Sequence, residues 1–190
     1  MPGVSSDVKS SALAASSIVR LEQDHERNLE EAISLSKKAV EAGPNFSSAL
    51  GTHGYNLFLA GRADEGITYL KRAIIANPRI TKNYHQLALV YRDKKDFINA
   101  INYHKESIVK VGNDNTLLSQ SDRTTRKGRY QYELAKTYSI SGLEVDTISL
   151  LVEAVSLNQT IKGLLKNDFE QNNYFQQLSG SEAFIKLIEP

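Results

Sequence analysis

The sequence predicts an all-α fold in which pairs of antiparallel helices repeat along the chain as a solenoid. Three observations predict it. The chain of 190 residues matches itself at an offset of 34 residues. Apolar residues within each matched unit fall at helical spacing, and Gly or Pro stands where a helix would have to end.

The self-match is strongest in the second helix of each unit. There a small residue followed by Ile recurs, and each unit ends on Pro or Gly. The aligned residues are Ala32, Gly66 and Ala100, then Ile33, Ile67 and Ile101, and at the unit ends Pro44, Pro78 and Gly112. Agreement of several independent columns at one period indicates a repeated structural unit.

A further copy follows after an insertion. An offset of 47 residues, which is 34 plus 13, aligns Leu134, Ala135, Tyr138, Gly142, Ile148, Leu151 and Ala154 with the preceding unit. The extra residues lie in "NDNTLLSQSDRTTRKG", between Gly112 and Gly128. We expect Asp122 or Ser121 to cap a helix that continues into Tyr132, because short polar side chains accept hydrogen bonds from free amides at a helix start.

The recurring residue types suit a helical hairpin. Small residues such as Ala88 and Ala100 stand where two helices must approach closely, because a larger side chain would push the axes apart. Gly61 and Gly142 suit the turn between the helices. Pro78 lacks an amide hydrogen and excludes the α conformation just before it, so it ends a second helix.

Two segments resemble the tetratricopeptide repeat family, "YHQLALVYRDKKDFINAINYHKESI" and "YELAKTYSISGLEVDTISLLVEAVSLN". The resemblance implies a right-handed superhelical solenoid with three clear repeats, a degenerate hairpin at the N-terminus and a helical cap at the C-terminus. In the unit 47–80, His53 stands where the family has Leu and Gly66 where it has Ala. We expect both to loosen this hairpin, Gly66 by about 1 kcal/mol relative to Ala.

The expected organisation is a flexible tail over residues 1–10 and a single helical domain over 11–190. The repeat units are placed at about 11–46, 47–80, 81–114 and 121–160, and the cap at 161–190. The cap carries apolar and aromatic residues that would cover the open end of the core. They are Leu164, Leu165, Phe169, Phe175, Leu178, Phe184, Leu187 and Ile188.

Composition narrows the function classes. The formal net charge is +1, so no overall field favours nucleic acid or a membrane surface, and neither is expected as a partner. The chain has no cysteine and shows no signal peptide or membrane span, which predicts a cytoplasmic protein.

The four histidines show no metal-ligand spacing; they are His25, His53, His85 and His104. We interpret His53 and His104 as packed core residues. We expect no catalytic residue, no cofactor and no metal.

The resemblance implies a concave groove lined by the first helix of each unit, used to bind a segment of another protein. Carried onto this chain, the groove positions are Thr52, Tyr55, Phe58, Lys82, His85, Gln86, Leu89, Arg92, Arg129, Tyr132, Glu133 and Lys136. The partner segment is expected to be extended or helical, and the basic residues favour an acidic one. In chaperone-binding members a terminal carboxylate is held by set Lys, Asn and Arg residues; here only Lys82 matches that set.

Two alternatives stay open. The basic cluster Arg123, Arg126, Lys127 and Arg129 is a solvated helix face, an acidic-peptide site or, least favoured, a nucleic-acid site. The whole chain is a protein-interaction adaptor or, alternatively, a structural module that stacks on another copy through its end repeats. The first predicts a monomer and the second a weak homo-oligomer.

Overall fold

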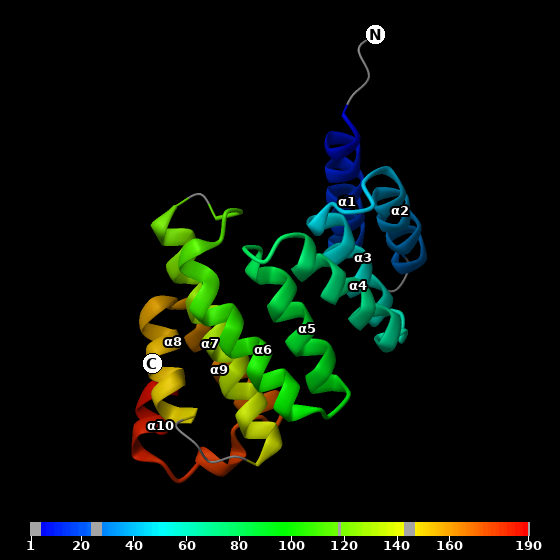
Figure 1. Ribbon diagram of the computed structural model, residues 1–190. Helices are drawn as coiled ribbons and strands as arrows, with labels where there is room; N and C mark the ends of the chain where they lie inside the picture. The colour runs from blue at the N-terminus through cyan, green and yellow to red at the C-terminus, as the bar shows by residue number, and fades with distance from the viewer. Residues whose placement is uncertain (1–4, 24–27, 118, 143–146, 190) are drawn as a thin grey trace. The chain divides into compact units, whose positions relative to one another are not determined.

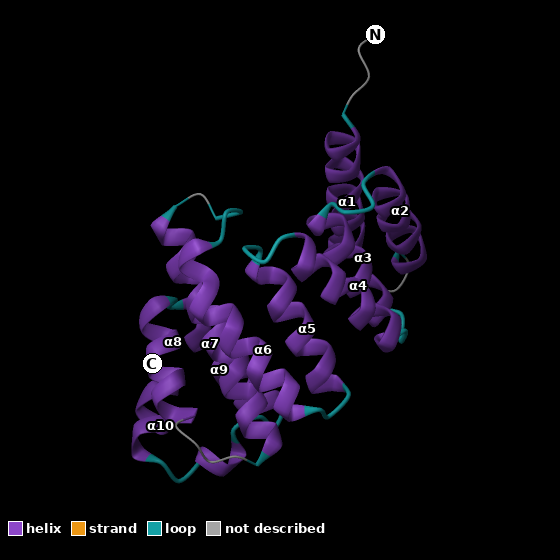
Figure 2. Ribbon diagram, in the orientation of Figure 1, coloured by secondary structure: helices purple, strands orange, loops and turns teal. Residues whose placement is uncertain are grey.

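The computed structural model describes residues 5–23, 28–117, 119–142 and 147–189. Its described elements are all helical, joined by loops and turns, and no strand occurs among these residues (Figure 2). The all-α prediction is confirmed. The chain divides into two compact units, Met1–Val90 and Tyr91–Pro190, with the boundary inside one helix.

The first unit consists of two helical hairpins and the start of a third (Figure 1). Its helices are α1 (Ser6–Gln23), α2 (Leu29–Ala42), α3 (Ser47–Leu59), α4 (Ala63–Ala76) and the N-terminal part of α5 (Thr81–Asp93). The helices α1 and α2 pack together, as do α3 and α4, and α3 also packs against α1 and α2.

The second unit continues the pattern and ends in shorter helices. It holds the last part of α5, then α6 (Phe97–Lys110), the 3-10 turn η1 (Val111–Asn113), α7 (Gln120–Ser141), α8 (Thr147–Leu157), α9 (Thr160–Gln171), η2 (Gln176–Leu178) and α10 (Glu182–Ile188). The hairpin partners here are α7 and α8, and α6 packs on α7. The predicted superhelical twist stays a prediction, as does the single domain over 11–190.

Three aligned residues, each just after a first helix, share one backbone conformation. Gly61, Lys95 and Gly142 occupy the same column of the repeat, and all three have positive φ, at 77°, 60° and 71°. The hydrogen bonds repeat as well, because Arg62 N donates to Leu57 O and the amide one repeat later, of Asp96, donates to Tyr91 O, each at 2.9 Å. The turn predicted from two glycines is therefore also formed around a lysine.

Two predicted boundaries are wrong. The helix α1 begins at Ser6 rather than near Ser11, and the buried Ser10 hydroxyl donates to the carbonyl oxygen of Ala39 at 2.8 Å, so residues 6–10 belong to the fold. The cap of α7 is Ser119, not Ser121 or Asp122. Ser119 accepts from the amide of Asp122 while the Asp122 carboxylate accepts from the Ser119 amide, which completes a capping box.

The hairpin of α3 and α4 closes through two facing glycines. A Cβ atom on Gly54 would lie 2.8 Å from the carbonyl oxygen of Gly66, and one on Gly66 would lie 2.6 Å from that of Gly54. The two backbones are in contact, so no side chain fits between them. The expectation that Gly66 loosens this hairpin overlooked this close packing.

A second contact that recurs along the chain sets a small residue against a carbonyl in the partner helix. Ser47 Oγ donates to the carbonyl oxygen of Ala73 at 2.8 Å, as Ser10 does to the aligned Ala39. Gly128 aligns with Ser47, and a Cβ there would lie 2.9 Å from the carbonyl oxygen of Ala154, which aligns with Ala73. The close approach to a carbonyl oxygen therefore recurs, with either a serine or a glycine at this position, and this supports the assignment of a repeated unit.

The C-terminal segment packs as predicted. Phe175 and Phe184 are fully buried, with ring centroids 6.2 Å apart, and Phe169 contacts Phe184 edge-on at 5.2 Å. Ser181 caps α10 by accepting from the amide of Phe184. Together with Ile161 and Leu165 these rings cover Leu151 and Ala154 of α8. Leu164 differs, because 37% of it is exposed.

Candidate functional site

The predicted groove residues fall in both units, and we take each unit by itself. The unit 1 face comprises Thr52, Tyr55 and Phe58 on α3 and Lys82, His85, Gln86 and Leu89 on α5. The unit 2 face comprises Arg92 on α5 and Arg129, Tyr132, Glu133 and Lys136 on α7. Their exposure and contacts decide which of them could reach a partner.

On the unit 1 face, α5 is held against α3 by a buried amide. Asn83 Nδ2 donates to Ser47 Oγ at 3.0 Å, and a Cβ on Gly51 would lie 2.1 Å from Asn83 Oδ1. This contact brings the first helices of two successive repeats into register. Asn83 was not predicted from the sequence, although Gly51 gave a signal for it, because a glycine inside a helix indicates close approach.

The accessible part of the unit 1 face is aromatic and basic. Tyr55 and Phe58 are half-buried, with ring centroids 5.7 Å apart, and Lys82, His85 and Leu89 are half-buried on α5. Thr52 and Gln86 are buried, at 8% and 5% exposure, so they line the base of the face.

A polar network inside unit 1 joins α1, α2 and α3, and it was not predicted from the sequence. The Asn56 amide donates to Ser17 Oγ at 2.7 Å and to Ser36 Oγ at 3.2 Å, and Ser36 Oγ lies 2.9 Å from His53 Nδ1. These residues tie α1 and α2 to α3. His53 is 4% exposed, so its interpretation as a core residue is confirmed, and the same holds for His104 at 0%.

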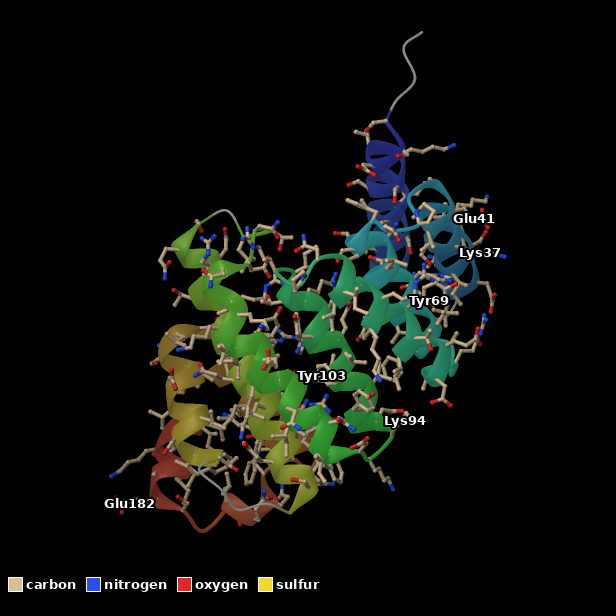
Figure 3. All side chains as sticks on the ribbon, viewed as in Figure 1. Lys37, Glu41, Tyr69, Lys94, Tyr103 and Glu182 are labelled. Atoms are coloured by element: carbon tan, nitrogen blue, oxygen red, sulfur yellow. The ribbon has the colours of Figure 1, made fainter. Side chains whose placement is uncertain are left out.

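The surroundings of His53 disfavour its charged form. Burial, followed by the nearby positive charges of Arg62 and Lys37, lowers the pKa of His53 below its ordinary value. The ring packs edge-on against Tyr69 with centroids 4.7 Å apart. Figure 3 labels Lys37 and Glu41 on α2 and Tyr69 on α4.

On the unit 2 face, most predicted residues already have partners inside the fold. Arg92 Nη1 lies 2.8 Å from Glu133 Oε2, and Lys136 Nζ lies 2.9 Å from Asp168 Oδ2. Each of these four side chains is less than one fifth exposed. Arg129 is exposed.

Tyr132 belongs to the core. It is 2% exposed, its hydroxyl donates to Asp168 Oδ2, and its ring lies 6.2 Å from that of Phe175. A side chain covered in this way cannot contact a partner, so we leave Tyr132 out of the proposed site. Burial, with the hydrogen bond to Asp168, raises the pKa of Tyr132 above its usual range.

Asp168 is the shared acceptor of a polar cluster in unit 2, and it was not predicted from the sequence. Besides Tyr132 and Lys136, it accepts from Asn172 Nδ2 at 2.8 Å, and Lys136 Nζ lies 4.3 Å from the Tyr174 ring centroid. Burial acts to raise the pKa of Asp168, but the hydrogen bonds from Tyr132 and Lys136 and the charge of Lys136 outweigh it and hold that pKa below its ordinary value. This cluster fastens α9 to α7.

Among the described residues, no group of three or more His, Cys, Asp or Glu side chains is placed to hold a metal ion. None of the described helices combines the length and apolar character that a membrane span requires. The expected cytoplasmic location stays an expectation.

Helical hairpins that recur along the sequence at an offset of 34 residues define an all-α repeat protein. The fold is that of the tetratricopeptide repeat proteins. A crystal structure of a putative kinesin light chain from Podosopora anserina with nearly identical TPR-like repeats matches with a TM-score of 0.64 and 14% identity, over 94% of this chain and 94% of that one.

Two other solved structures share the fold. The crystal structure of MamA matches with a TM-score of 0.60 and 16% identity, over 88% of each chain. The Sgt2 TPR domain from Aspergillus fumigatus matches with a TM-score of 0.50 and 16% identity, over 67% of this chain and 80% of that one. No family model matches the chain. A search of curated proteins likewise finds no match.

Proposed function

We propose that this protein is a non-catalytic adaptor that binds a segment of another protein along the first helices of its repeats. The observation that carries the proposal is the half-buried pair Tyr55 and Phe58 on α3, set beside an α5 that Asn83 fixes in register. Aromatic side chains held on rigid helices lose little entropy on binding and supply most of the apolar contact area.

The charges of the two faces contribute differently. Lys82 and His85 place basic character beside the aromatic pair and favour an acidic partner segment. Arg92 and Lys136 are neutralised by Glu133 and Asp168, so Arg129 is the cation of the unit 2 face that would attract an acidic segment. A rim charge of this kind raises the association rate more than the affinity.

The test is the double substitution Tyr55→Ala with Phe58→Ala. A partner captured from the native source by the full chain, then purified, is titrated by calorimetry against both proteins. We expect at least a tenfold loss of affinity, because truncation of interface aromatics commonly costs about 2 kcal/mol.

The matched control is Ile75→Ala on α4, the second helix of the same hairpin, where Ile75 is 82% exposed. It should bind the partner normally. Equal affinity of the double variant and the wild type, with both shown to be folded by circular dichroism, would remove the unit 1 face from the function.

A second candidate is a structural module that stacks on another copy. Exposed apolar side chains near both ends of the chain favour it: Val8 on α1 is 58% exposed, and Ile185 on α10 is 38% exposed. Sedimentation at several concentrations separates the two candidates. A stacking module grows with concentration, and the adaptor stays a monomer.

A further inference from the structure

The insertion between the repeats at 81–114 and 121–160 builds a hollow on the second unit. It lies among the end of α6, η1, the start of α7 and the end of α8, and its volume is about 520 Å³. That volume lies within the range of about 300–1,000 Å³ that is typical of ligand sites. None of the residues of the unit 1 or unit 2 face lines it.

One side of the hollow is apolar. Ile108 and Val109 come from α6 and Leu157 from the end of α8. Val109 is 79% exposed, which places a branched apolar side chain in water at the edge of the hollow. Covering that surface with an apolar group from a partner is favourable, at about 25 cal/mol for each Å² removed from water.

The other side is basic and ordered. Arg123 and Lys127 lie one helical turn apart on α7. Arg123 Nε and Nη2 donate to the carbonyl oxygens of Gly112 at 3.1 Å and Asp114 at 3.3 Å. The guanidinium is thus oriented by main-chain acceptors, and the acidic group that interacts with its charge is the exposed carboxylate of Asp122. A carboxylate of a ligand can therefore bind the guanidinium at little further cost in side-chain entropy.

Lys127 has a partner that a ligand could replace. Its Nζ lies 3.1 Å from Glu153 Oε1, with the two side chains 39% and 48% exposed. Ion pairs this exposed contribute little stability. A carboxylate of a ligand therefore competes with Glu153 at small cost.

We propose that this hollow is a second docking site, which binds an acidic protein segment carrying an aliphatic side chain. The aliphatic group lies against Ile108, Val109 and Leu157, and the neighbouring carboxylates reach Arg123 and Lys127. Charge complementarity selects an acidic segment, and no aromatic residue is among those lining the hollow, as base stacking of nucleic acid would require. The residues that line this site are not among those of the proposed groove.

The test uses a displayed library of short random peptides selected on the full chain. A fluorescein-labelled peptide from the selection is then titrated by fluorescence anisotropy against the wild type, Val109→Asp, and Val109→Asp with Arg123→Glu. We expect selected peptides rich in Glu or Asp next to Leu or Ile. Both variants should bind at least about tenfold more weakly, and a peptide with Lys in place of the acidic residues should bind just as weakly.

The matched control is Ile98→Asp, because Ile98 lies on the same helix, is 76% exposed and does not line the hollow. It should bind the peptide as the wild type does, and so should the variant Tyr55→Ala with Phe58→Ala. The proposal is overturned by failure of the selection to yield a saturable peptide, or by affinity that Val109→Asp leaves unchanged. It is also overturned if the wild type self-associates in sedimentation and Val109→Asp abolishes this, since the occupant would then be a second copy.

Discussion

Gly54 and Gly66 face each other across the α3 and α4 hairpin so closely that a Cβ atom on Gly66 would lie 2.6 Å from the carbonyl oxygen of Gly54. Real Cβ atoms do not approach a carbonyl oxygen this closely. The missing side chains are what allow the two helices to touch.

Substitution Gly66→Ala should therefore destabilise the protein, although alanine is the better helix former. We expect the free energy of unfolding to fall by about 1–3 kcal/mol, because overpacking outweighs the gain in helix propensity. Urea unfolding followed by circular dichroism measures it. Gly163→Ala on α9 is the control, since no described atom lies within 4 Å of a Cβ there, and it should stabilise by about 0.5–1 kcal/mol. A more stable Gly66→Ala variant would contradict the close contact.

The shared turn conformation predicts opposite effects at two aligned positions. Gly61→Ala should lower the free energy of unfolding by about 1 kcal/mol, because a side chain disfavours positive φ. Lys95→Gly should raise it by up to about 1 kcal/mol by relieving the same strain. Thermal unfolding of both variants measures the two changes, and shifts of the same sign would show that the turns differ.

His53 makes the first unit sensitive to mild acid. Its pKa is lowered in the fold, so the unfolded chain takes up a proton near the ordinary value of about 6.5 while the folded chain does not. The stability that His53 contributes is complete above that pH and falls as the pH drops below it. Urea unfolding between about pH 5 and 8, compared with His53→Leu, measures this contribution. The variant should lose less stability on acidification, and an equal loss would assign the effect to other groups.

Asp168 should be essential to the stability of the second unit. Asp168→Asn removes the negative charge beside Lys136 and replaces one of the two acceptor oxygens with an amino group, so Tyr132 and Asn172 can no longer donate to separate oxygens. We expect a loss of about 2–4 kcal/mol. Unfolding in urea, followed by near-ultraviolet circular dichroism of the tyrosines, reports the change. Lys186→Ala serves as comparison, because its ion pair with Glu182 is exposed and should contribute little.

The same carboxyl group gives the protein a second acid-sensitive contribution to stability, at a lower pH than that of His53. Because the pKa of Asp168 is lowered in the fold, its contribution is present above the ordinary value of about 4 and is lost as the pH falls further. Asp168→Asn should remove this part of the acid sensitivity. An unchanged acid profile in the variant would mean that the carboxylate is not stabilised as the geometry indicates.

The periodic part of the fold could be predicted because it depends on short-range spacing. Gly61 and Gly142 indicated the turns, Ala100 and Ala154 the helix contacts, and Phe184 the cap. The burial of Tyr132 and the ion pair of Lys136 could not be predicted. Both depend on Asp168, which lies 36 and 32 residues further along the chain. The spacing of the repeat placed Tyr132 and Lys136 on a first helix, but it carried no information on which segment would cover that helix. Ser119 was missed because three polar residues within four positions could each cap α7, and only the backbone path decides among them.

The contact in which Ser10, Ser47 and Gly128 each oppose a carbonyl of the partner helix has a bearing on how such chains diverge. The requirement at this contact is a small residue rather than a particular one, so replacements accumulate while the helices stay in place. Proteins of this architecture then lose sequence similarity long before they lose similarity of backbone structure, so their relationship must be sought by comparing structures.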